Sequence, residues 1–149
     1  MSKVVIPKEV DMFLRPYVEQ VDKLGLRKEG GIYQTDPVYS SYQYYMPGTE
    51  TEQILATIEL ERSWDKNGNF VSRDKWDVDL TINTRVVLVA KTTATKDKTS
   101  VSYKITVSHL KSFNNKDFHR GIEWLKTIIL RYKQIQNKAK MLEFEGDFQ

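Results

Sequence analysis

The sequence predicts an α+β fold: an N-terminal helix, a four-stranded antiparallel meander sheet and a long amphipathic C-terminal helix, with both helices on one face of the sheet. This prediction depends on the hydrophobic period, which is helical at both ends of the chain and changes to two between them. A length of 149 residues is that of one domain. We expect a single domain over residues 1–142 and an acidic, aromatic tail over residues 143–149.

The N-terminal helix is predicted over residues 7–24, where apolar side chains recur at helical spacing from Val10 onward and Gly25 follows as a stop signal. Pro16 interrupts this pattern. Because a proline inside a helix removes a hydrogen bond at a cost of about 3 kcal/mol, we expect a kinked helix or two short helical turns.

Alternation of apolar and polar residues predicts the strands, at residues 38–46, 54–61, 76–95 and 100–109. The turns set the register of two hairpins. We expect these opposed pairs: Trp64 with Trp76 and Leu60 with Leu80 in the first, and Thr95 with Ser100, Val86 with His109 and Lys91 with Lys104 in the second. Both registers keep the apolar residues on one face, where His109 is expected as a hydrogen-bonded core residue.

The C-terminal helix is predicted over residues 116–142, which corresponds to about 40 Å of helix. Its apolar stripe consists of Phe118, Ile122, Leu125, Ile129 and Tyr132. Asn114, with Asp117 three residues later, resembles an N-cap signal. The side chains opposite the stripe are mostly basic, so the helix should cover the sheet and expose a basic surface.

Basic residues are concentrated in the last third of the chain. Residues 91–142 hold twelve Lys or Arg and three Asp or Glu, whereas the rest of the chain is acidic. A surface of this kind attracts an anionic partner. The candidate nucleic-acid-binding residues are Lys91, Lys104, Lys116, Arg120, Lys126, Arg131, Lys133, Lys138 and Lys140.

The face of the sheet turned away from the helices is predicted to be open, and it carries apolar residues on an otherwise polar surface. These candidate partner or dimer contacts are Tyr45, Leu55, Val87 and Val89. Apolar groups that gather on a surface usually mark an interface. We therefore expect a protein partner or a second subunit to cover them, and a homo-oligomer is the expected state.

Catalytic and cofactor motifs are scarce. The chain has two histidines, no cysteine and no glycine-rich phosphate-binding loop, so neither a catalytic residue nor a cofactor is assigned.

Four carboxylates on neighbouring strands, Glu59, Glu61, Asp77 and Asp79, form a candidate Mg²⁺ or Ca²⁺ site for a nuclease. An ordinary solvated sheet face is the alternative, and no metal is assigned. His119 is expected on the surface.

Apolar runs are short throughout the chain, and the longest outside the N-terminal residues is Val86–Ala90. Such runs fit strands and are too short for a signal peptide or a membrane span. No membrane association is therefore expected. The absence of cysteine permits a reducing compartment, and a cytoplasmic location is the expectation.

The C-terminal residues Leu142-Glu143-Phe144-Glu145-Gly146-Asp147-Phe148-Gln149 form an acidic, aromatic tip after a basic body. This tip resembles the tails of single-stranded-DNA-binding proteins, which end in acidic residues and Phe and recruit partner proteins. It departs from them in having three acids and a final Gln149. The order of strands followed by a helix resembles the Whirly and transcriptional-coactivator type of single-strand binder, which lacks the N-terminal helix.

Two functions are consistent with these patterns. The first is a small non-enzymatic nucleic-acid-binding protein, single-stranded or non-specific, that uses the basic surface of residues 91–142. The second is a phage-type protein inhibitor or adaptor that grips another protein through the open sheet face or its edge.

Overall fold

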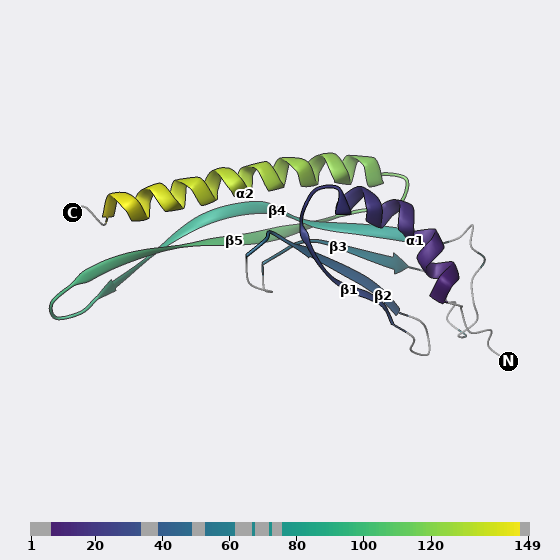
Figure 1. Ribbon diagram of the computed structural model, residues 1–149, viewed down its shortest axis with the longest axis horizontal. Helices are drawn as coiled ribbons and strands as arrows, with labels where there is room; N and C mark the ends of the chain where they lie inside the picture. Colours follow the sequence, from purple (N-terminus) through teal and green to yellow (C-terminus); the bar gives the residue numbers. More distant parts are fainter. Residues whose placement is uncertain are drawn as a thin grey trace.

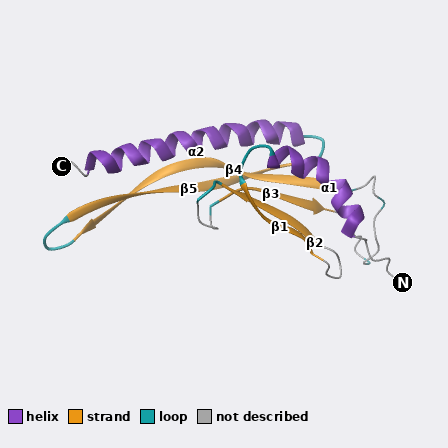
Figure 2. Cartoon of the chain, in the orientation of Figure 1, coloured by secondary structure: helices purple, strands orange, loops and turns teal. Residues whose placement is uncertain are grey.

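The computed structural model describes residues 7–33, 39–48, 53–61, 67, 72 and 76–146 (Figure 1). Its elements are α1 (Pro7–Asp22), β1 (Arg27–Tyr33), β2 (Tyr39–Tyr45), β3 (Ile54–Glu61), β4 (Asp77–Ala94), β5 (Thr99–Phe113) and α2 (Phe118–Gly146). The strands form an antiparallel meander in the order β1-β2-β3-β4-β5, and α2 packs on this sheet (Figure 2). The fold is of the predicted α+β class, with an N-terminal helix, an antiparallel meander and a long C-terminal helix on the sheet, and it has five strands in place of four.

The strand that the sequence does not predict is β1, which pairs with β2 at the edge of the sheet. Its residues, Arg-Lys-Glu-Gly-Gly-Ile-Tyr, do not alternate between apolar and polar. Gly30 has a φ of 90°, and a Cβ atom there would lie 2.2 Å from the backbone oxygen of Ser41. The glycine that breaks the pattern is therefore required by the close approach of the two strands.

The register of the first hairpin differs from the predicted one. Ile58, rather than Leu60, lies opposite Leu80. Because the shift is by two residues, each side chain keeps its predicted face, and the inner face of β4 is buried as expected. Trp64 lies outside the described residues.

The second hairpin shows the same kind of difference, since Val86 lies opposite Val107 rather than His109. The shift separates Lys91 from Lys104, so the prediction that these two residues are cross-strand neighbours is wrong. The core position predicted for His109 is also wrong, because this residue is exposed and has a φ of 66°.

An irregularity between β2 and β3 changes the predicted open face. The register shifts between Tyr44 and Tyr45, so that Tyr45 lies opposite Ile54 and Leu55 is the extra residue. Leu55 is fully buried in the hydrophobic core. Tyr45 is 4% exposed, and the Arg27 guanidinium lies 4.6 Å from its ring centre. The prediction that Tyr45 and Leu55 are exposed to a partner is therefore wrong.

One hydrophobic core joins both helices to the sheet. The helix α1 continues through Pro16, so the alternative of two short turns is wrong. Edge-to-face aromatic contacts connect α1 to its neighbours: the ring centre of Phe13 lies 5.0 Å from that of Trp76, and Tyr17 lies 4.9 Å from Phe118. These contacts fix the start of α2 beside α1.

A polar turn leads into α2. The Asn114 side-chain oxygen accepts hydrogen bonds from the backbone N–H groups of Lys116 and Asp117, at 3.0 and 3.1 Å. The Asn114 side chain therefore stabilises the turn that precedes α2, and it does not cap the first turn of the helix itself. The helix runs from Phe118 to Gly146, so the first residues of the predicted tail are helical.

Gly121 lets the beginning of α2 lie close to the sheet. A Cβ atom at this position would lie 2.8 Å from Leu80 Cδ2 and 3.0 Å from Phe113 Cγ, and both of these side chains are buried. A larger residue would overpack this contact, at a typical cost of about 1–3 kcal/mol. The missing side chain therefore sets how closely α2 approaches β4 and β5.

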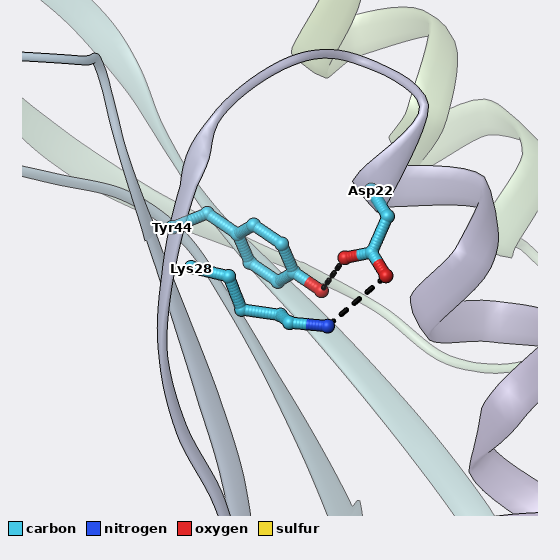
Figure 3. A network of polar contacts seen from close by, with 3 residues as sticks. All are labelled: Asp22, Lys28 and Tyr44. Carbon is cyan, nitrogen blue, oxygen red and sulfur yellow. Dashed lines mark hydrogen bonds and ion pairs between the residues drawn. The ribbon is translucent and has the colours of Figure 1, made fainter.

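A polar network joins the C-terminal end of α1 to the sheet (Figure 3). Asp22 accepts a hydrogen bond from the Tyr44 hydroxyl at 3.1 Å and forms an ion pair with Lys28 at 3.0 Å. Burial, followed by the charge of Asp22, raises the pKa of Tyr44 far above its ordinary value of 10.0. The folded protein therefore favours the neutral hydroxyl.

We predict that the free energy of unfolding falls as the pH rises above about 10, because folded Tyr44 keeps a proton that an unfolded tyrosine loses. Tyr44→Phe should lessen this fall by up to about 1.4 kcal/mol per pH unit. Near neutral pH the same variant should cost about 1 kcal/mol through the lost hydrogen bond. Urea denaturation at several pH values measures both effects. An alkaline slope equal to that of the wild type would show that Tyr44 does not hold its proton.

Candidate nucleic-acid interface

The solvent-facing side of α2 carries basic residues on two flanks. At about 100° per residue, these are Arg120, Arg131 and Lys138 on one flank, and Lys126, Lys133 and Lys140 on the other. All of them are exposed. We call the second flank the lysine row. Because a seven-residue repeat drifts by about 20° on a straight helix, the lysine row winds slowly around α2 toward its sheet-facing side.

Most of these cations have no acidic partner. Lys126 Nζ lies 3.2 Å from Glu123 Oε1, and both side chains are about half exposed, so this pair contributes at most about 1 kcal/mol. The other five basic residues of the two flanks form no ion pair with any residue that the structure describes. Their charge is available to an anionic ligand.

Trp124 lies on the same flank as Arg120 and Arg131 and is 40% exposed. Lys111 Nζ, from β5, lies 4.8 Å from the centre of the Trp124 ring. An exposed tryptophan among cations is a surface on which a base can stack. The sequence contains a signal for this residue, since Trp124 falls outside the apolar stripe of the helix, on the flank of Arg120 and Arg131.

The β4–β5 hairpin extends beyond the other strands as a two-stranded arm (Figure 1). We define this arm as residues 89–102, in which every side chain is exposed. It carries three basic residues, Lys91, Lys96 and Lys98, and one acidic residue, Asp97. The structure therefore divides the predicted site between α2 and the arm: Lys91 belongs to the arm, Lys104 lies at its base, and Lys116 lies in the turn before α2.

A cleft of about 410 Å³ lies beside the second half of α2. Its lining includes Gln53 before β3, Tyr103 and Ile105 of β5, and Tyr132, Gln136 and Lys140 of α2. Gln53 is 9% exposed, and its side-chain oxygen has no hydrogen-bond partner among the described residues. Lys140 connects the cleft to the lysine row. Nothing in the sequence pattern indicates this cleft, because its lining comes from four separate segments.

The predicted acidic cluster is arranged differently from the expectation. Glu59 lies opposite Asp79 and Glu61 opposite Asp77. Among the described side chains, which do not include that of Glu61, no group of three or more His, Cys, Asp or Glu is placed to hold a metal ion.

His119 is exposed in the first turn of α2, as expected. No helix in the described ranges is both long and apolar enough to cross a membrane.

The apolar residues that remain on the open face do not form a compact patch. Val87 is half-buried and Val89 is 44% exposed. The most exposed apolar residue of the face, Leu110, pairs with Asn83, which is six residues from Val89 along β4 and thus about 20 Å away. A partner would need to cover two separate apolar positions rather than one surface.

No protein-family model, curated protein or solved structure matches this chain. The function must therefore be inferred from the chemistry of the described surfaces. Among these, the two flanks of α2 combine exposed, unpaired positive charge with an exposed aromatic ring.

We predict that Val89→Asp changes the free energy of unfolding by less than about 1 kcal/mol, because Val89 is on the surface of the arm. Val86→Asp, which places the same charge on the buried inner face of β4, should cost more than about 3 kcal/mol. Denaturation of the two variants compares them, and light scattering reports the molar mass. Unfolding by Val89→Asp would contradict the assigned faces of β4, and a fall in molar mass would place Val89 in a subunit interface.

Proposed function

We propose that this protein binds nucleic acid through its backbone phosphates, without catalysing a reaction, and that it favours single strands or binds without sequence specificity. The observation that carries this proposal is the solvent-facing side of α2. There, five exposed cations have no acidic partner among the described residues. Exposed basic residues of this kind release counterions from a phosphate backbone, and this release provides most of the affinity in non-specific binding.

The length of the basic surface is suited to a polyanion. Lys126 and Lys140, the two ends of the lysine row, are fourteen residues apart on one continuous helix, which corresponds to about 21 Å. A linear arrangement of charge over this distance matches about six steps of a duplex at 3.4 Å each. A small anion would need only one of these positions, whereas a nucleic-acid strand can contact the whole row.

Trp124 is the feature that favours single strands. Unpaired bases stack on exposed aromatic rings irrespective of sequence, with about 1–3 kcal/mol for each base. The ring lies between Arg120 and Arg131 on one flank of α2. A strand bound along this flank would thus meet phosphate contacts on both sides of a stacking surface.

The arm provides a second basic element for the same ligand. Two-stranded β-ribbons can enter a groove of duplex DNA, and Lys96 and Lys98 lie at the tip of this ribbon. Comparison of single-stranded with double-stranded ligands therefore separates the two basic elements. The alternative function, an inhibitor or adaptor that grips a protein through its open face or its edge, has less support, because the described residues do not form the apolar patch expected on the open face.

We predict that the double variant Lys133→Gln/Lys138→Gln weakens oligonucleotide binding and lowers the slope of log affinity against log salt. Each lost phosphate contact should reduce the slope by about 0.7–0.9. Fluorescence anisotropy of labelled oligonucleotides, titrated at several salt concentrations, measures this slope.

The matched control is Lys8→Gln/Lys23→Gln, which removes the same charge from exposed positions at the two ends of α1. Its slope should equal that of the wild type if α2 is the contact surface. Equal losses in the two double variants would show that net charge alone, and not the α2 surface, determines binding. No binding of any oligonucleotide at low salt would overturn the proposed function.

A further inference from the structure

The cleft beside α2 has features that phosphate binding alone does not require. Its walls include two tyrosines, Tyr103 and Tyr132, and the aliphatic side chain of Ile105. The Tyr132 hydroxyl is uncharged at neutral pH, and burial raises its pKa further above the ordinary value of 10.0. Walls of this kind accept a flat, largely apolar ring.

Gln53 lines this space, and its side-chain oxygen is buried without a partner among the described residues. A buried acceptor without a partner costs about 1–3 kcal/mol, so a rotation of the Gln53 side chain toward a ligand that donates a hydrogen bond to this oxygen would regain that energy. Amide groups pair with the edges of nucleobases, which present both donors and acceptors. The second amide of the cleft, Gln136, comes from α2.

Lys140 connects this space to the basic surface. It is exposed, it lines the cleft, and it is the last member of the lysine row that begins at Lys126. The drift of the row around the helix brings its end toward the sheet-facing side, where Tyr132 and Gln136 lie. A strand that follows the row therefore arrives at the mouth of the cleft with a phosphate near Lys140.

We propose that the cleft receives one unstacked nucleotide of the bound strand, with its base between the tyrosine-lined walls, the base edge bonded to Gln53 and its phosphate on Lys140. This assignment rests on the proposed function, because the strand is delivered by α2. The cleft volume of about 410 Å³ limits it to a single nucleotide.

The experiment compares a thymidine oligonucleotide of about twelve residues, within the range of site sizes of single-strand binders, with an abasic strand of the same length and charge. Because Trp124 can also stack a base, the comparison is made in the Trp124→Ala variant, which should bind the thymidine strand about tenfold more tightly, the equivalent of one base held in the cleft. Gln53→Leu added to this variant should remove the difference and retain the affinity for the abasic strand. The control Gln134→Leu makes the same chemical change on the exposed side of α2 and should preserve the difference.

A second variant, Ala139→Phe, tests the cleft from the helix side, where the larger side chain fills the space while Gln53 itself is unchanged. It should also abolish the preference for bases. Equal affinity of the Trp124→Ala variant for both strands would overturn the cleft assignment while leaving phosphate binding by α2 intact. Failure of both strands to bind would overturn the proposed function and the cleft assignment together.

Thymidine monophosphate distinguishes a free nucleotide from a nucleotide within a strand. Under the proposal it binds at least a hundredfold more weakly than the oligonucleotide by calorimetry, because it lacks the contacts along the lysine row. Three results together would contradict the assignment to a strand. The mononucleotide would bind tightly, Gln53→Leu would abolish this binding, and the two strands would bind with equal affinity.

Discussion

The close contact of Gly121 with Leu80 and Phe113 is the constraint on which the rest of the structure depends. It lets the first turns of α2 approach β4 and β5 more closely than any other residue would allow. Since α2 is one continuous helix, this contact, together with the Tyr17–Phe118 contact, sets its course along the hairpin. The outward direction of its basic residues and the place of the cleft beside its second half follow from that course.

The sequence predicts which residues face the core better than it predicts which residues are neighbours. Alternation assigns a strand residue to a face, but a shift of two residues leaves that pattern unchanged. The pairing of Ile58 with Leu80 and of Val86 with Val107 was therefore not predictable from the pattern, although all of these faces were. Lys91 and Lys104 were matched wrongly for the same reason.

The elements that the sequence does not reveal are those in which tertiary packing overrides the local pattern. Strand β1 contains two glycines and pairs with β2 despite its lack of alternation. Leu55 enters the core because the β2–β3 ladder contains an irregularity, and this single extra residue removes the basis for a predicted partner face. The basic exterior of α2, by contrast, was predictable, because it follows from the helical period alone. The cleft was not, because its lining residues are distant in the sequence.

Nucleic acid that lies along the exposed side of α2 would shield the lysines there from chemical modification, and lysine footprinting measures this protection. The protein is acetylated with a small reagent in the presence and absence of a single-stranded oligonucleotide, and the modified lysines are quantified by mass spectrometry. The oligonucleotide should protect Lys126, Lys133 and Lys138 and leave Lys8 and Lys23 as reactive as before. A bound oligonucleotide that leaves the α2 lysines fully reactive would contradict this placement of the nucleic acid.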